Sequence, residues 1–203
     1  VLKEMARLAF MKDGYFVGEF NRIFKDIFNE EKIYKKIILL LSRYKSLKGP
    51  EVAALLDVSG GGGLVDILNN LEWAGFIKTQ TPWERPSETK LKRYYLSDEY
   101  TLFYFQFIQP HLKRICENKD FQTAIDFFKS PSYKIWAGFA FERVCLKHVD
   151  RIMDILGIVP LVKNYGSYFN RASNTKEGVQ IDLMFDRHDP VVTICEMKYY
   201  QGL

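Results

Sequence analysis

The stretch "GVQIDLMFDRHDPVVTICEMKYY", residues 178–200, decides how the end of this sequence is interpreted. It contains two apolar runs, residues 179–185 and residues 191–195, joined by the polar segment "DRHDP". Asp and Pro are typical of tight turns between strands, so the pattern predicts a β-hairpin. The hairpin would bring the residues that follow its second strand close to those of its first strand.

Three chemically active residues lie on this predicted hairpin, namely Asp182, Glu196 and Lys198. Glu196 and Lys198 are two residues apart, so on a strand they project from one face. If the register also brings Asp182 to that face, two carboxylates lie close together and need a cation between them. We therefore predict a Mg²⁺ site at Asp182 and Glu196, with Lys198 assisting phosphodiester cleavage. The alternative is a surface ion pair between Glu196 and Lys198, worth at most about 1 kcal/mol.

Composition places the chain among folded proteins with one large or two small domains. It has 203 residues, 47% of them hydrophobic, and a formal net charge of +4, which permits contact with nucleic acid. Cys116, Cys145 and Cys195 are widely spaced, which favours reduced thiols in a cytoplasmic protein. No apolar run approaches the roughly 18 residues of a membrane span, and the charged start does not resemble a signal peptide. The first residue is not Met, so we expect a piece of a longer protein.

The earlier part of the chain predicts helices followed by a second hairpin. Residues 1–29 have apolar positions at helical spacing and a glycine-containing turn, "KDGYFVGEF". Residues 30–97 show three helical patterns and then two strands, an order typical of a winged helix with a helix-turn-helix. Residues 98–130 form a helical bridge that begins with an aromatic helix, and residues 131–203 form the last domain. This domain would open with one long helix ending before Gly157, which gives an α+β fold overall.

Contact with DNA by the predicted winged helix has evidence on both sides. The candidate recognition helix, residues 62–73, carries Asp66 and Glu72 but no Lys or Arg, although phosphate contacts need positive side chains. The positive charge lies in the following hairpin, at Lys78, Arg85, Lys90, Lys92 and Arg93. The sequence leaves open whether these residues bind DNA or the domain packs against protein. We expect Trp73 and Trp83 to pack in the core and in the hairpin.

Two other site classes are excluded by spacing. The glycine run at residues 59–63 is not followed by Lys and Ser or Thr, so it does not match a phosphate-binding loop. The three histidines are scattered without a metal-binding spacing, which argues against a zinc hydrolase.

The last domain resembles the PD-(D/E)XK nuclease core in the order of its charged residues. "WAGFAFERVCLKHV" places Glu142 on a helix, and a strand, a strand with Asp182 and a strand with Glu196 and Lys198 follow. The resemblance implies that Glu142 completes the acidic site, that Asp182 and Glu196 bind the metal, and that Lys198 assists catalysis. Two features depart from the family: Ile181 stands where Pro usually precedes the Asp, and the sequence stops before the expected closing helix and strand.

A wider resemblance covers most of the chain. "LNNLEWAGFIKTQTP", "YYLSDEY", "GFAFE" and "ICEMKYY" are similar to the C-terminal region of a prokaryotic AAA-type ATPase family. That likeness implies a preceding ATPase domain that alone binds ATP, with residues 1–29 as the end of its lid. The leading hypothesis is therefore a DNA-binding winged helix coupled to a Mg²⁺-dependent nuclease-like hydrolase domain. The alternative is a non-enzymatic DNA- or protein-binding module with a degenerate nuclease fold.

Overall fold

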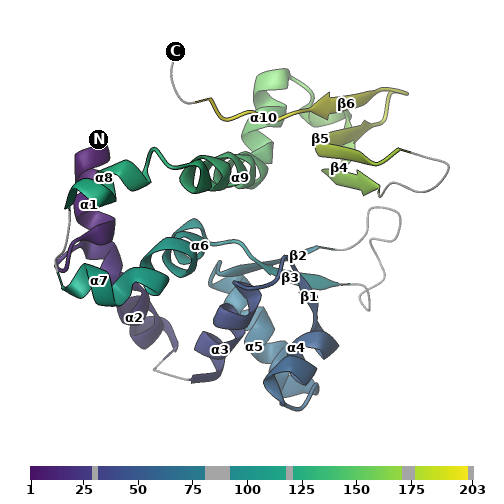
Figure 1. The fold of residues 1–203 in the computed structure, drawn as a ribbon. Coiled ribbons are helices and arrows are strands. Elements are labelled where there is room, and N and C mark those ends of the chain that lie inside the picture. The colour runs from purple at the N-terminus through teal and green to yellow at the C-terminus, as the bar shows by residue number, and fades with distance from the viewer. Residues whose placement is uncertain (29–31, 81–91, 118–120, 171–176, 201–203) are drawn as a thin grey trace. The chain divides into compact units, whose positions relative to one another are not determined.

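The computed structural model describes residues 1–28, 32–80, 92–117, 121–170 and 177–200, and the chain divides into two compact units. The first unit is Val1–Lys129 and the second is Ser130–Leu203. Helices dominate, and each unit contains one small antiparallel sheet, which confirms the expected α+β class (Figure 1). No helix in the described parts of the chain combines the length and apolarity that a membrane crossing requires.

The first unit begins with the predicted helical pair, α1 (Leu2–Phe10) and α2 (Tyr15–Phe28). The turn between them is shorter than expected, since Gly18 lies within α2. Gly14 closes the turn in close contact with α1, where an added Cβ would lie 2.5 Å from the carbonyl oxygen of Leu8. Only glycine fits that approach without moving the backbone.

Three helices and a three-stranded sheet follow. They are α3 (Lys32–Leu41), β1 (Leu47–Lys48), α4 (Gly49–Leu56), α5 (Gly62–Trp73), β2 (Ile77–Gln80) and β3 (Arg93–Leu96). The strand order is β1-β3-β2 with antiparallel neighbours, so the predicted hairpin forms and the short strand β1 adds to it. The predicted sequence of helices and strands is therefore present.

The aromatic segment after β3 is irregular rather than one continuous helix. It runs as α6 (Glu99–Phe103), a π-helical turn (Tyr104–Ile108), a 3₁₀ turn (Gln109–His111) and α7 (Leu112–Cys116), with α8 (Phe121–Phe127) after it. Pro110 has no backbone N–H to continue an α-helical ladder, and the preceding Gln109 bonds five residues back to Tyr104. The sequence predicted an aromatic helix at the start of this segment and did not predict the π turn.

One core joins the parts of the first unit. The ring of Phe20 in α2 stacks on that of Tyr104 with centroids 4.6 Å apart, and Phe24 contacts Phe76 at 5.0 Å. Ile108 and Ile115 belong to the same buried cluster. The expected helical bridge thus shares its core with the helices that precede it.

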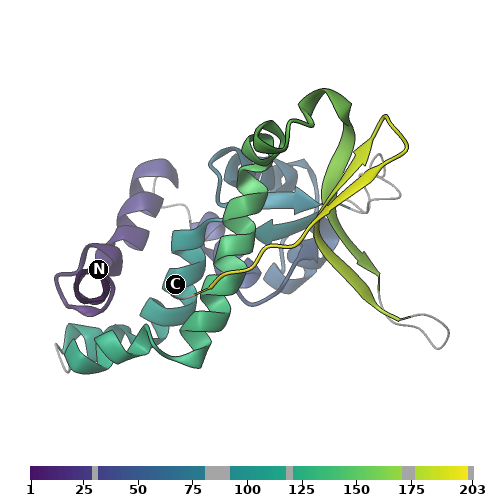
Figure 2. The ribbon, with the colours of Figure 1, turned by 90° about the horizontal axis from the view of Figure 1, so that it is seen from above.

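The second unit places two helices with a three-stranded sheet. They are α9 (Pro131–Lys147), α10 (Val149–Leu156), a 3₁₀ turn (Val159–Leu161), β4 (Val162–Asn170), β5 (Val179–Arg187) and β6 (Val192–Cys195). Strand order is β4-β5-β6, with Leu183 opposite Cys195, so the hairpin at residues 179–195 is confirmed. The chain beyond β6 continues along α9, where Tyr199 lies against Phe141 (Figure 2).

The predicted long helix is wrong, since it breaks at His148 into α9 and α10. His148 has φ −116° and ψ 32°, outside the helical region. After the break, Val149 and Met153 of α10 are buried in a small core together with Leu183 and Phe185 of β5. Burial of these side chains explains why a continuous apolar pattern in the sequence does not yield one continuous helix.

Candidate active site

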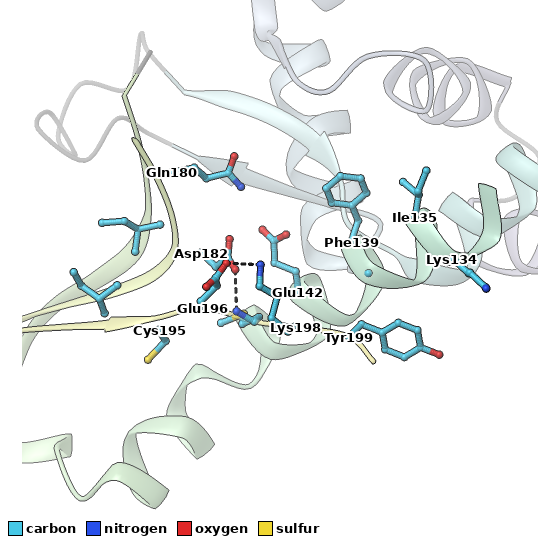
Figure 3. Close-up of a pocket in the computed structure, with 14 residues that line it drawn as sticks. Lys134, Ile135, Phe139, Glu142, Gln180, Asp182, Cys195, Glu196, Lys198 and Tyr199 are labelled. Carbon is cyan, nitrogen blue, oxygen red and sulfur yellow. Dashed lines mark hydrogen bonds and ion pairs between the residues drawn. The ribbon is translucent and has the colours of Figure 1, made fainter. Parts of the chain in front are cut away.

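Four charged side chains named by the sequence line one pocket of the second unit, with a volume of about 650 Å³. Glu142 comes from α9, Asp182 from β5, and Glu196 and Lys198 from the segment after β6 (Figure 3). The structure therefore brings together residues that are far apart in sequence.

The register of the hairpin explains how the two carboxylates come together. Leu183 pairs with Cys195 at the last position of the β5–β6 ladder, so Asp182 and Glu196 follow directly beyond it. Leu183 faces the core, and Cys195 and Met197 pack against the same core. Asp182 lies at an irregularity of β5, and Glu196 and Lys198 follow the end of β6; all three side chains line the pocket and none belongs to this core. Met197, between Glu196 and Lys198, is thus partly buried against the core of the second unit.

Asp182 is held by two hydrogen bonds. Its Oδ2 accepts from the backbone N–H of Met197 at 2.9 Å, which fastens the segment after β6 to β5. Its carbonyl oxygen accepts from the hydroxyl of Ser167 at 2.8 Å. Ser167 lies at a shift in the β4–β5 register between Gly166 and Tyr168. The extra residue of this bulge lies in β5, where Asp182 and Leu183 stand opposite Ser167 alone, and bulges re-aim the side chains of the strand that carries them.

Lys198 forms an ion pair with Glu196, and both side chains are more than half exposed. The hydrogen bond with Glu196 and that group's charge raise the pKa of the Lys198 ammonium, and the charge of Asp182 adds to the effect. Lys198 is therefore a cation at neutral pH. A permanently charged ammonium suits the stabilisation of negative charge and does not suit the role of general base.

Glu142 lines the pocket from one face of α9. Its charge, together with burial as the larger cause, raises the pKa of the Cys145 thiol one turn later. The Cys195 thiol also has a raised pKa because of burial. Both cysteines are thus kept as thiols, which makes them poor nucleophiles and poor metal ligands.

The carboxylates form a pair rather than a larger cluster. Within the described residues, no group of three or more His, Cys, Asp or Glu side chains is placed to hold a metal ion. A metal at this pocket would take Asp182 and Glu196 as protein ligands and fill its other positions with water or phosphate oxygens. That donor set fits Mg²⁺, which keeps several waters and accepts one or two carboxylates.

The structure describes three of the five cations proposed for DNA contact, and their surroundings differ. Lys78 is exposed on β2. Lys92 lies 3.4 Å from Glu72 of α5, and Arg93 donates to the hydroxyl and carbonyl oxygens of Ser46 at 2.9 and 2.8 Å. Arg85 and Lys90 fall outside the described residues. Lys92 and Arg93 therefore connect elements of the first unit to one another.

Trp73 was expected in the core, but its side chain is 82% exposed. The inner positions of α5 are Leu64, Leu68 and Leu71. Trp73 follows Leu71 by two residues, about 200° around the helix, and so points away from the core. Trp83 falls outside the described residues.

Further pocket-lining residues were missed in the sequence, among them Ile135, Phe139, Gln180 and Tyr199. Two of them carried a signal. Ile135 and Phe139 precede Glu142 by seven and three residues, so all three lie on one helix face. Gln180 precedes Asp182 by two residues on β5, but the bulge at Asp182 and Leu183 interrupts the alternation of side chains, so the sequence did not predict that both line one pocket.

Comparison with known proteins adds a family match and a relative. Residues 104–202 match DUF234, described as archaeal and bacterial proteins of unknown function. The uncharacterized protein MJECL04 of Methanocaldococcus jannaschii is 28% identical over 198 residues. That match covers 97% of this chain and 42% of the relative, so the chain spans less than half of the relative's length.

Among solved structures, an apo-form mutant of Lactococcus lactis ZitR aligns with 70% of this chain and 92% of its own. The sequence identity is 13% and the TM-score is 0.33, which does not establish a shared fold.

Proposed function

We propose that the second unit is a metal-dependent phosphodiesterase that acts on DNA, with a PD-(D/E)XK nuclease-like fold. The observation that carries the proposal is the convergence of Glu142, Asp182, Glu196 and Lys198 on one pocket. The hairpin register supports it, because Asp182 and Glu196 follow directly beyond the last pair of the β5–β6 ladder and both line the pocket.

Asp182 and Glu196 would hold a Mg²⁺ ion, and Glu142 would contribute negative charge from the opposite wall of the pocket. The bound ion would supply Lewis-acid activation of water and neutralisation of the phosphate. Asp182 is already oriented by the Met197 N–H, which leaves its second carboxylate oxygen for a ligand. Glu196 must exchange its ion pair with Lys198 for the ion.

Lys198 would then turn its ammonium to a phosphate oxygen. Its raised pKa keeps it protonated, so it stabilises the charge that develops on the phosphate during cleavage. In the ion pair of the present structure, Lys198 occupies the position beside Glu196 that Mg²⁺ would take. Glu196 likewise occupies the position beside Lys198 that the phosphate oxygen would take.

Cleavage of plasmid DNA by the 203-residue chain, with Mg²⁺ or Mn²⁺ against EDTA, tests the proposal. We expect Glu196→Gln and Lys198→Ala each to lower the rate by roughly 100-fold or more, as losses of charge stabilisation do. The matched controls are Asp154→Asn on α10 and Lys163→Ala on β4, both exposed. Cleavage unchanged by both Glu196→Gln and Lys198→Ala would refute the assigned roles.

We propose a second function for the first unit, as a winged helix that contacts protein through α5. The element order from α3 to β3 supports the winged helix. The exposed Trp73, the absence of basic residues on α5 and the internal pairing of Lys92 and Arg93 favour a protein partner over DNA. This is also the role that remains if the second unit has no catalytic activity.

Salt-dependent DNA binding separates these roles. A winged helix on DNA loses affinity steeply with salt, and Lys78→Ala reduces the slope by about one. A protein-contact role predicts no effect of Lys78→Ala on DNA binding. A chain whose DNA affinity falls in Lys78→Ala but not in Glu196→Gln would contradict the protein-contact proposal.

We also propose that the chain acts with an ATPase domain of the same polypeptide, in the cytoplasm. The support is the resemblance of "YYLSDEY" and "ICEMKYY" to the AAA-type family, together with the greater length of the archaeal relative. The sequence of the complete gene tests it: a phosphate-binding loop upstream supports the ATPase, and its absence contradicts the proposal.

A further inference from the structure

The pocket has a second, apolar wall that the proposed hydrolysis does not use. Ile135 and Phe139 of α9 line it with side chains 63% and 57% exposed. Within the described residues the ring of Phe139 contacts no other aromatic ring. A large ring held at an open pocket beside charged groups is well placed to contact a flat ligand.

Phe139 is coupled in position to the acidic site. It lies three residues before Glu142, so the two side chains are neighbours on α9, about one helical turn apart. Gly138 also lines the pocket, and an added Cβ there would meet no atom within 4 Å. The helix surface at Gly138, the residue before Phe139, is therefore open.

Gln180 completes the polar side of this region. It is exposed, lies two residues before Asp182 on β5 and projects toward the same side of the carboxylates as Phe139 (Figure 3). A Gln amide both donates and accepts hydrogen bonds, which suits the edge of a nucleobase.

The geometry points to an unpaired nucleotide of a DNA strand as the ligand of this pocket, which rests on the proposed function. Its base stacks on Phe139, Gln180 contacts the base edge, and the adjoining phosphate lies at Asp182, Glu196 and Lys198.

Two observations favour an unpaired base over duplex. A base that is paired and stacked in a duplex exposes no face to a ring such as Phe139, whereas stacking on aromatic side chains is the usual mode for single strands. The only ammonium groups among the residues that line the pocket are Lys134 and Lys198, and Lys198 is paired with Glu196. Binding to the backbone of a duplex needs more phosphate contacts than these two ammonium groups provide.

The test is binding of a single-stranded DNA oligonucleotide that contains 2-aminopurine, measured with the 203-residue chain in EDTA. Stacking quenches 2-aminopurine, and anisotropy of an end label gives the affinity. We expect Phe139→Ala to remove the quenching and to weaken single-strand binding by about 5- to 100-fold. Phe139→Tyr keeps a ring and retains both signals. Ile155→Ala, which alters an exposed apolar side chain of α10 away from the pocket, changes neither.

Two results would overturn the inference. One is equal quenching and affinity for Phe139→Ala and the unchanged chain. The other is duplex DNA of the same sequence that binds as tightly as the single strand, with the same dependence on Phe139. Because Phe139 is exposed, we expect the thermal unfolding of Phe139→Ala and Phe139→Tyr to match that of the unchanged chain. If Phe139→Ala is less stable, Phe139→Tyr still tests whether an aromatic ring is sufficient for quenching.

The same oligonucleotide with Mg²⁺ separates this inference from the proposed hydrolysis. Quenching that depends on Phe139 without Glu196-dependent cleavage retains the nucleotide pocket and rejects the hydrolase. Glu196-dependent cleavage of duplex and single strand alike, unaffected by Phe139→Ala, retains the hydrolase and rejects the unpaired base.

Discussion

The two units bury their apolar side chains very differently. The first unit holds a continuous core in which rings such as Phe20, Phe24 and Tyr104 pack with aliphatic residues from α3 to α7. The second unit has a small core of Val149, Met153, Ile158, Leu183 and Phe185. It leaves large apolar side chains exposed, among them Phe139, Ile155 and Ile194. Because buried apolar area is the main source of stability, we expect the first unit to be the more stable.

The charged residues differ in the same way. In the first unit, Lys92 and Arg93 connect β3 and its preceding residue to other elements. In the second unit, the pair of Glu196 and Lys198 lines an open pocket. Charges that join elements contribute to the fold, whereas charges at a pocket can exchange their partners for a ligand. Ion pairs also join strands in the second unit, such as Lys163 of β4 with Asp186 of β5 at 3.4 Å. What distinguishes the second unit is that its pair of Glu196 and Lys198 lies at a pocket.

The largest expected effect comes from the core of the first unit. Phe24 is 1% exposed and packs on Phe20 and Phe76, so Phe24→Ala should cost about 3–5 kcal/mol of unfolding free energy. Ile27→Ala, on the same helix but half exposed, should cost well under that amount. Urea unfolding followed by circular dichroism measures both. Equal losses would contradict the core described for the first unit.

A smaller effect is expected where the candidate site depends on one hydrogen bond. Asp182→Ala removes the acceptor of the Met197 N–H and should destabilise the second unit by about 1–3 kcal/mol. Asp182→Asn keeps an oxygen acceptor and should lose less. Hydrogen exchange of the Met197 amide reports the bond directly. If that amide is equally protected in both variants, Asp182 does not hold the segment after β6.

A change at Arg93 tests whether the charges of the first unit are structural. Arg93→Met removes two hydrogen bonds to Ser46 and an ion pair with Glu51 at 3.5 Å, and should cost about 1–2 kcal/mol. Lys78→Met, in the exposed position on the neighbouring strand, should change stability by less than about 0.5 kcal/mol. Thermal unfolding of the two variants distinguishes them. A larger loss in Lys78→Met would reverse the assignment.

The smallest effect concerns the titration of Lys198. Its pKa is raised chiefly by Glu196, so Glu196→Gln should lower it toward the ordinary value, which NMR of the labelled lysine side chain can follow. The pKa of Lys198 is higher in the folded chain than in the unfolded chain. Its ion pair therefore stabilises the fold fully below about pH 10.4, and this contribution is lost as pH rises through the folded-state pKa. The part of the pKa rise of Lys198 that remains in Glu196→Gln should come from the charge of Asp182. An unshifted Lys198 in Glu196→Gln would show that the ion pair does not persist in solution.

Local patterns in the sequence were sufficient for much of the fold. The hairpin at residues 179–195, the strands β2 and β3 and the helical pair at the start were all predicted, because alternation and turn residues act over a few positions. The break at His148 and the π turn at Tyr104–Ile108 were not. The break at His148 depends on packing with side chains distant in sequence. The π turn depends on the helical hydrogen-bond ladder that Pro110 interrupts. A short window of residues reveals neither effect.

For the site, the sequence by itself determined which residue types were present. It also predicted a strand carrying Glu196 and Lys198 on one face, whereas β6 ends at Cys195 and both residues follow it. Only the tertiary structure decided that Asp182 joins them and that Glu142, Phe139 and Gln180 line the same pocket. The reason is physical: strand register is set by the burial of Leu183 and Phe185 with Met153 of α10, and Leu146 of α9 packs against the same cluster. These contacts join residues far apart in the chain.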